Sequence, residues 1–176
     1  MIDFSNIQNK KIVFDSLGEY DFLRPDFKAN LIFRGELFPS AEHAYQAAKN
    51  WDNLEWRKKI LSIHSPIDAR LFGNQKEFSN WEIQKLGVLE EVQFAKFNSN
   101  FQLKLRLLLT TGYVLSPSEI PEELAFVSKN KKIDLGEILM KIRDKIEKNE
   151  GNYFQLLLRF LHSHGIGFME PWLASK

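Results

Sequence analysis

The chain has 176 residues, 44% of them hydrophobic and 27% charged, which indicates one ordinary globular domain. Its formal net charge of +1 argues against binding along extended nucleic acid, which favours a basic excess, but leaves recognition of a single nucleotide or a nucleic-acid end open. No apolar run approaches the roughly 18 residues that span a bilayer. The N-terminus also lacks the basic and apolar regions of a signal peptide, so we expect a cytoplasmic protein without membrane contact.

The chain contains no cysteine, which excludes disulfides, thiolate zinc sites, iron–sulfur clusters and cysteine nucleophiles. Its four histidines are scattered, so the ligand set of a zinc-dependent deaminase is missing. Nothing in the sequence requires a cofactor, and we expect none.

Short apolar runs separated by turn signals predict strands in the first 38 residues. We expect strands at residues 12–14 and 30–33, and a turn at 34–36 that leads into residues 37–38. Residues 22–27 contain a proline and are predicted to form a loop.

From residue 40 onward the pattern becomes helical. Ser40 is a suitable N-cap, and Ser65 with Pro66 is a strong start signal for another helix. Residues 113–134 read as an irregular connection with room for one short strand. Helices are expected at residues 40–51, 54–63, 66–73, 81–97, 101–110, 135–148 and 152–164.

These elements predict an α+β fold that is mostly helical, with a few short N-terminal strands and an extra C-terminal helix. We place one domain at residues 1–149 and a helical extension at 150–176, packed on the same domain. Phe97 and Phe101 are expected in the core because they lie at helical spacing among leucines. The sequence leaves the oligomeric state open.

The stretch from Arg34 to Lys49, RGELFPSAEHAYQAAK, closely resembles the signature of the NADAR family, also called the YbiA-like N-glycosidases. Further matches follow in the family's order, and the resemblance covers about residues 12–146. They are Ser65-Pro66, Ala69-Arg70, Gly73, Trp81, Phe94–Phe97, Leu107–Gly112 and Leu135–Arg143.

The resemblance implies hydrolysis of the C–N glycosidic bond of a ribose-phosphate compound, with water as the second substrate. The family's substrates include phosphoribosylamino-pyrimidine intermediates of riboflavin synthesis and ADP-ribose attached to guanine in nucleic acid. The expected partner is therefore a substrate that contains ribose phosphate or ADP-ribose, in the second case carried on nucleic acid.

Three segments depart from the family pattern. The family's Ser-Asn-Phe is replaced around residues 24–27, its acid followed by Trp-Gly is missing from residues 121–126, and its Asn is replaced by Ile133. Glu122, Glu123 and Asp134 are the candidates to replace the missing acid. Because these segments frame the leaving group in the family, we favour ADP-ribosylated guanine over the riboflavin intermediates. The alternative is an ADP-ribose- or nucleotide-binding module that has lost catalysis.

Glu42 is the candidate catalytic residue. It lies in the first turn of a predicted helix, where the helix dipole favours a carboxylate, and taken alone it reads as an ordinary helix acid. The resemblance implies that it stabilises an oxocarbenium-like state or activates water.

Lys49, two turns or about 10 Å further along the same helix, is expected to contact phosphate or ribose, with a solvated surface lysine as the alternative. Tyr45 either orients the carboxylate and lines the site or belongs to the core, and His43 is expected to be a structural hydrogen-bonding residue.

The remaining candidates for substrate binding are spread along the chain. Trp81 offers a stacking surface for a base, or is simply a core tryptophan. Lys85 either binds phosphate or is an exposed lysine. Arg24 and Asp26 are expected to hold phosphate and ribose hydroxyls respectively, with ordinary turn chemistry as the alternative, and Asp134 completes the set.

Overall fold

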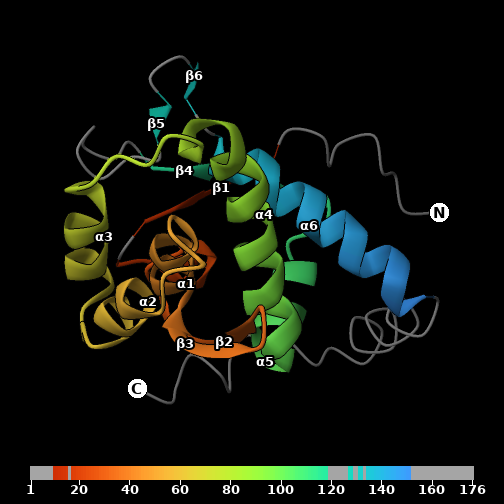
Figure 1. Ribbon diagram of the computed structural model, residues 1–176. Coiled ribbons are helices and arrows are strands. Elements are labelled where there is room, and N and C mark those ends of the chain that lie inside the picture. The colour runs from red at the N-terminus through yellow and green to blue at the C-terminus, as the bar shows by residue number, and fades with distance from the viewer. Residues whose placement is uncertain (1–9, 16, 119–126, 129–130, 133, 152–176) are drawn as a thin grey trace, which may run out of the picture. The chain divides into compact units, whose positions relative to one another are not determined.

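Figure 1 shows the computed structural model, which describes residues 10–15, 17–118, 127–128, 131–132 and 134–151. The chain forms two units, residues 1–143 and 144–176. The elements in chain order are β1 (Lys11–Phe14), η2 (Asp21–Leu23), β2 (Lys28–Phe33), β3 (Glu36–Ser40), α1 (Ala41–Ala48), α2 (Leu54–Leu61), α3 (Pro66–Asn74), α4 (Trp81–Ser99), α5 (Phe101–Leu108), β4 (Val114–Pro117), β5 (Val127–Ser128), β6 (Lys131–Lys132) and α6 (Leu135–Glu150), the last of which continues into the second unit. The predicted α+β, mostly helical fold is confirmed, whereas the helix predicted at 152–164 lies outside the described residues.

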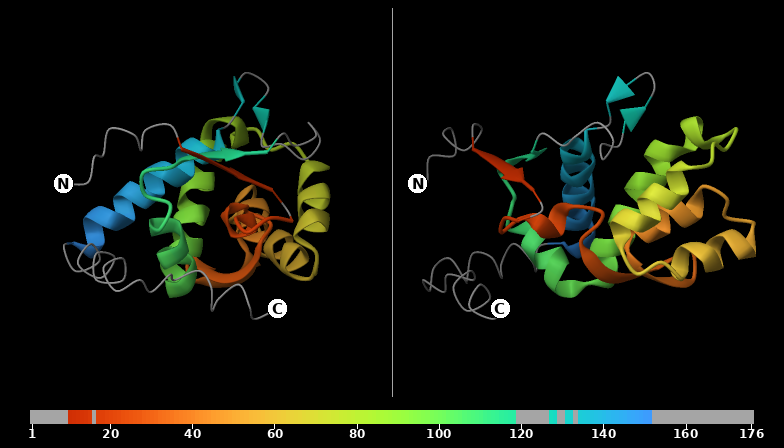
Figure 2. Two further views of the ribbon diagram at one scale, coloured as in Figure 1. Left: turned by 180° about the vertical axis from the view of Figure 1, so that it is seen from behind. Right: turned by 90° about the vertical axis from the view of Figure 1, so that its left-hand side faces the viewer.

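The described strands pair two by two instead of forming one sheet. β2 and β3 form an antiparallel hairpin, β5 and β6 form another, and β1 runs parallel to β4; Figure 2 shows the β2–β3 hairpin and the β1–β4 pair from two further sides. The predicted turn after β2 is confirmed, since Phe33 pairs with Glu36 across a two-residue loop in which Arg34 and Gly35 both have positive φ (48° and 82°). This backbone matches the twist of the flanking strands, and glycine adopts it without strain.

The hairpin delivers the chain directly into α1. Its inner face is aromatic, with Phe33 and Phe38 packed edge to face at 6.3 Å between ring centroids and Trp51 at 5.4 Å from Phe33. Ser40 is both the last residue of β3 and the N-cap of α1, because its Oγ accepts a hydrogen bond from the His43 amide. The predicted cap is therefore confirmed, and the start of α1 is tied to the hairpin.

All eight residues of α1 are buried, and the helix packs against α2, α3, α4 and the hairpin (Figure 1). Its four alanines allow the neighbouring helices to approach closely. α1 ends at Ala48, three residues before its predicted end, because the amides of Lys49 and Asn50 bond back to Gln46 and Ala47 in a tighter, 3₁₀-type turn.

Two further observations differ from the expected fold. Within residues 113–134, expected to contain at most one short strand, the described residues form three, β4, β5 and β6, and β4 pairs in parallel with β1. Phe101, expected in the core, is 65% exposed because it is the first residue of α5, before the helix meets its neighbours. Among the described helices, none is both long and apolar enough to cross a bilayer.

α3 lies against α1 at Gly73, which touches the side chain of Gln46. A Cβ added at Gly73 would lie 2.0 Å from Gln46 Oε1, and this buried side chain has little room to retreat because its Nε2 donates to Glu42 Oε1 at 2.7 Å. We therefore predict that Gly73→Ala lowers the free energy of unfolding by about 1–3 kcal/mol, although alanine is by itself the better helix former.

The matched control is Gly87→Ala in α4, where an added Cβ meets nothing within 4 Å. The free energy of unfolding of this variant should rise by up to about 1 kcal/mol, because alanine favours the helix more than glycine does. Urea unfolding of both variants checks the pair, and equal stability changes at the two sites would contradict this account of α1–α3 packing.

Candidate active site

Glu42 sits at the centre of a buried polar cluster at the start of α1. Its side chain is 0% exposed, its Oε1 accepts from Gln46 Nε2 at 2.7 Å, and its Oε2 accepts from Arg70 Nη2 at 2.6 Å. Its amide donates to the carbonyl of Pro25 at 2.9 Å, which joins α1 to the segment after η2. The residue is therefore not a solvated helix acid: both carboxylate oxygens have buried partners.

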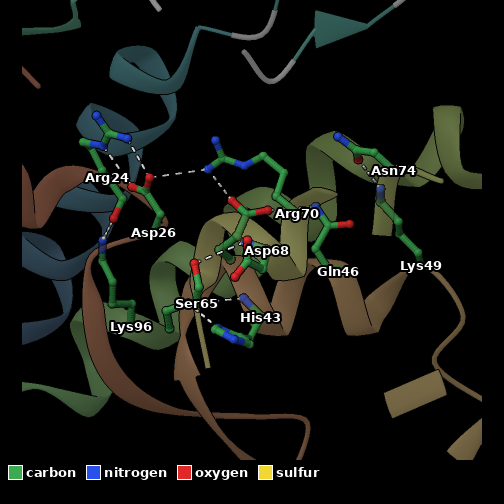
Figure 3. Close-up of polar contacts among 12 residues, drawn as sticks. Arg24, Asp26, His43, Gln46, Lys49, Ser65, Asp68, Arg70, Asn74 and Lys96 are labelled. Carbon is green, nitrogen blue, oxygen red and sulfur yellow. Dashed lines mark hydrogen bonds and ion pairs between the residues drawn. The ribbon is translucent and has the colours of Figure 1, made fainter. Parts of the chain in front are cut away.

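Four charged side chains alternate in sign through this cluster (Figure 3). Arg24 binds Asp26 through two hydrogen bonds of 2.9 and 2.6 Å, Asp26 lies 3.8 Å from Arg70, and Arg70 binds Glu42. Burial alone would raise the pKa of Asp26, but the hydrogen bonds and charge of Arg24, together with the charge of Arg70, lower it. Burial opposes the charge of Arg70, whereas Glu42 and Asp26 raise its pKa, so Arg70 and Asp26 both remain charged at neutral pH.

His43 lies next to Glu42 in sequence but faces a different set of partners. Its Nε2 donates to the carbonyl of Ile63 at 2.9 Å, and its Nδ1 accepts from the Ser40 hydroxyl at 2.7 Å, which is the arrangement of a neutral ring. Burial lowers the pKa of His43, in agreement with that state. The predicted structural role agrees with these bonds.

A second group of predicted residues lies further along α1. Lys49 donates to the Gly73 carbonyl at 3.1 Å and to Asn74 Oδ1 at 2.8 Å, and its Nζ is 5.7 Å from the centroid of the Trp81 ring. Burial lowers the pKa of Lys49 to about 8, against the opposing charge of Glu42. Figure 3 shows Lys49 on the far side of Gln46 from the Arg24 end of the cluster, so the expectation that it does not pair directly with Glu42 agrees with the structure.

Tyr45 and Trp81 pack edge to face beside this lysine, with ring centroids 4.9 Å apart. Tyr45 is buried, and burial, followed by the charges of Glu42 and Glu82, raises its pKa. Trp81 is half-buried, so part of its surface is open to solvent. The core position, one of the two alternatives given for Tyr45, thus agrees with the structure, and its role in orienting the Glu42 carboxylate stays a prediction.

Lys85 and Asp134 differ from the simplest expectations. Lys85 is buried, not exposed, and pairs with Glu82 at 2.6 Å, while its positive charge contributes to the lowered pKa of Lys49. Asp134 is exposed and caps α6, since its Oδ1 accepts from the amides of Gly136 and Glu137 at 2.9 and 3.2 Å. Of the candidates to replace the missing acid, Asp134 is thus occupied as a helix cap, and Glu122 and Glu123 lie outside the described residues.

Three polar residues of this region were not among the predicted site residues. Gln46 and Arg70 bind the Glu42 carboxylate, and Lys96, which is buried in α4, donates to the carbonyls of Phe22 and Arg24 at 2.8 and 2.9 Å. The pattern of buried positions could have indicated the two basic residues: Arg70 lies on the same helix face as small buried residues, and Lys96 follows the buried residues of α4 at helical spacing. A basic residue on a buried helix face signals a buried partner, even though the sequence does not say which one.

No group of three or more His, Asp and Glu side chains suited to a metal ion occurs in the part of the chain that the structure describes. What the cluster offers chemically is a carboxylate held in a fixed orientation by an arginine and an amide.

The Glu42–Arg70 pair generates a stability prediction. Arg70→Gln should lower the free energy of unfolding by about 3–5 kcal/mol, because it leaves a buried carboxylate without its cation. The control is Arg34→Gln. Because the partner of Arg34, Glu91, is half exposed, this substitution should lower the free energy of unfolding by at most about 1 kcal/mol. Chemical denaturation at neutral pH checks both, and a loss at Arg70 no larger than at Arg34 would show that the pair does not stabilise the fold.

The chain is similar in sequence to several known proteins. The chain is 30% identical over 122 residues to the proteins named N-glycosidase YbiA of Shigella sonnei (strain Ss046) and Escherichia coli (strain K12), which covers 64% of this chain and 72% of each relative. It is 27% identical over 155 residues to the riboflavin biosynthesis protein VVA0006 of Vibrio vulnificus (strain YJ016), covering 82% of this chain but 41% of that protein.

The fold is also found among solved structures. The NMR structure of the Escherichia coli protein YbiA matches with a TM-score of 0.68 at 24% identity, covering 81% of this chain and 88% of that one. The sequence profile of the NADAR domain matches residues 4–147, which are 144 of the 176 residues. The resemblance noted in the sequence is thereby confirmed, and the chain belongs to the NADAR domain family.

Proposed function

We propose that the protein is an N-glycoside hydrolase that cleaves the C–N glycosidic bond of a ribose-phosphate or ADP-ribose adduct, and that Glu42 is its catalytic carboxylate. Membership of a family whose relatives carry the name N-glycosidase supports the class of reaction. The observation that carries the assignment to Glu42 is its anchoring, because Arg70 and Gln46 bind its two oxygens in the first turn of α1.

In the reaction, the bond between the anomeric carbon and the base nitrogen breaks, and the bond electrons leave with the nitrogen. Positive charge develops on the sugar, and a fixed carboxylate stabilises it. Water then adds its oxygen to the anomeric carbon, and its proton balances the charge on the departing nitrogen. An ionised Glu42 suits this chemistry, since it can interact with the cationic sugar or accept the proton from water.

Substrate binding is assigned to the groups around the carboxylate. Lys49 is proposed to contact a phosphate, and Trp81 to stack on a base with its exposed face. Arg24 and Asp26, whose side chains are 15% and 10% exposed, are proposed to contact phosphate and ribose hydroxyls. Because no part of Glu42 is exposed in this conformation, catalysis requires neighbouring side chains to move when the substrate binds.

Among the two substrate types of the family, we propose ADP-ribosylated guanine, in a cytoplasmic setting. The departures from the family pattern near the leaving group support it, and the name of the Vibrio vulnificus relative keeps the phosphoribosylamino-pyrimidine intermediates as the second choice. Two of the three segments that depart from the pattern, 121–126 and residue 133, lie outside the described residues.

A second candidate function is a nucleotide-binding module without catalysis. The specific observation in its favour is the complete burial of Glu42 in an ion pair with Arg70, which is also how a purely structural carboxylate is satisfied. Incubation of the protein with ADP-ribosylated guanosine and with a phosphoribosylamino-pyrimidine separates the two, since binding without release of base or sugar identifies the module.

We predict that Glu42→Gln lowers kcat by about 100- to 10,000-fold while ADP-ribose still binds, because the amide keeps the shape but loses the negative charge. Glu91→Gln, which changes an exposed carboxylate paired with Arg34, is the matched control and should retain wild-type turnover. Wild-type turnover by a correctly folded Glu42→Gln protein would refute the assignment.

The lowered pKa of Lys49 predicts a pH dependence of binding. As the pH rises through about 8, Lys49 loses its proton, so affinity for ADP-ribose should fall by about tenfold, whereas an ordinary lysine would stay charged to about pH 10. Lys49→Arg is the control: arginine keeps its charge, and its affinity should stay level over the same range. Calorimetric titrations from pH 6 to 10 decide it, and identical pH curves for wild type and Lys49→Arg would contradict the phosphate role.

A further inference from the structure

Lys96 is a buried ammonium whose described partners are backbone carbonyls and not a carboxylate. The residue is 0% exposed in the middle of the unit, and its Nζ donates to the carbonyl oxygens of Phe22 at 2.8 Å and Arg24 at 2.9 Å. Within the described residues, no carboxylate forms an ion pair with it. Figure 3 shows the lysine reaching from α4 to the backbone beside Arg24.

Placing such a group in the interior is unfavourable. Removing an ammonium from water costs several kcal/mol unless an anion or several hydrogen bonds compensate, and burial lowers the pKa of Lys96 to about 7, against the opposing charges of Asp26 and Asp21. A methionine of similar length would fill the same volume without this cost. The unfavourable burial of Lys96 therefore points to a role for the backbone segment that its ammonium binds.

The ammonium binds the segment around residues 22–26, which carries Arg24 and Asp26 of the charge cluster. Phe22 and Leu23 are buried, and the chain becomes extended at Arg24. The next carbonyl, that of Pro25, accepts from the Glu42 amide at 2.9 Å. The segment is thus fastened to α4 on one side through Lys96 and to the first turn of α1 on the other.

Asp26, the next residue after Pro25, shares Arg70 as a partner with Glu42, the candidate catalytic residue. Asp26 Oδ2 lies 3.8 Å from Arg70 Nη2, the same nitrogen that binds Glu42 Oε2 at 2.6 Å. A displacement of this segment would move Asp26 relative to Arg70, and Arg70 would then shift its position relative to Glu42.

We propose that Lys96 is a positioning residue: from α4 it fixes the segment that carries Arg24 and Asp26, and through Asp26 and Arg70 it sets the orientation of Glu42. The inference rests on the proposed function for its effect on turnover, whereas its structural effect is independent of any substrate. Lys96 itself does not touch the reacting atoms.

The test is Lys96→Met, which removes the ammonium and keeps an unbranched side chain that is only one atom shorter. We expect kcat to fall by about 10- to 100-fold, because small misplacements of catalytic groups have effects of this size. The Kd for ADP-ribose should rise as well, because Arg24 and Asp26 lie on the same segment, but the number of ADP-ribose sites per chain should stay unchanged. A simple loss of folded protein would instead reduce the active fraction and the number of ADP-ribose sites together.

The matched control is Arg143→Met. Arg143 is also a buried cation bonded to backbone carbonyls, those of Thr110 and Tyr113, but it lies in α6. This variant should lose stability and retain kcat. An equal fall in kcat for both variants would overturn the positioning role.

A second experiment restores the ammonium at position 96 by chemical modification. Because the chain has no cysteine, Lys96→Cys introduces the only thiol, and alkylation of the unfolded protein with bromoethylamine before refolding creates a side chain of lysine length with a terminal ammonium. The aminoethylated protein should regain kcat, and the unmodified Lys96→Cys protein should not. A refolded, aminoethylated protein that stays as slow as Lys96→Met would overturn the inference.

Hydrogen exchange of the Glu42 amide, followed by NMR, separates failure of this inference from failure of the proposed function. That amide is bonded to Pro25, so Lys96→Met should speed its exchange by about tenfold relative to wild type, and Arg143→Met should not. Unchanged exchange overturns the positioning role, whereas faster exchange in a protein that hydrolyses neither candidate substrate supports it and refutes only the proposed activity.

Discussion

The buried ion pair between Glu42 and Arg70 is the interaction on which the rest of the site depends. Neither charge could be buried alone without a large penalty, so α1 and α3 must lie where the two side chains meet at 2.6 Å. The packing permits this distance, because α1 presents alanines and α3 presents Gly73 at the contact. Helix packing and electrostatics therefore require each other here: a larger side chain between the helices would separate the pair, and loss of the pair would leave a charge in the interface.

The same requirement explains why the cluster has four members. Arg70 and Glu42 neutralise each other, and Asp26 is a second carboxylate within reach of Arg70 that needs its own cation, which Arg24 supplies through two hydrogen bonds. Two cations and two anions in alternation give a neutral group, and such a group is buried at less cost than any of its parts. The pKa of Asp26 is lowered and that of Arg70 is raised, so these two groups keep their charges across the neutral range.

The sequence was most informative where the physical cause is local. Ser40 as a cap and the turn at Arg34-Gly35 depend on residues within three positions of each other, and the structure has both. The interactions that sequence reasoning missed join distant residues: β1 pairs with β4 about a hundred residues later, and Lys96 binds a carbonyl 74 positions away. Amphipathic spacing places Arg70 and Lys96 on buried faces, but a periodic pattern carries no information about the partner across the interface. Likewise, the family signature pointed to Glu42, and only the three-dimensional arrangement identified the arginine that binds it.

Three cations of this region, Arg70, Lys49 and Lys96, differ in a way that bears on how a substrate would bind. Arg70 contacts carboxylates, and their charges raise its pKa. Lys49 and Lys96 bond to carbonyl or amide oxygens, which compensate burial less well, so their pKa values fall to about 8 and about 7. A phosphate that approaches Lys49 would supply the missing negative charge and raise the pKa of Lys49 again. Under the proposed function, binding of an anionic substrate and protonation of Lys49 would therefore be linked, whereas the charge of Arg70 beside Glu42 is present without any ligand. The arginine thus sets the electrostatic surroundings of the carboxylate in advance, and the proposed role of the lysine on the other side of Gln46 is to respond to the ligand.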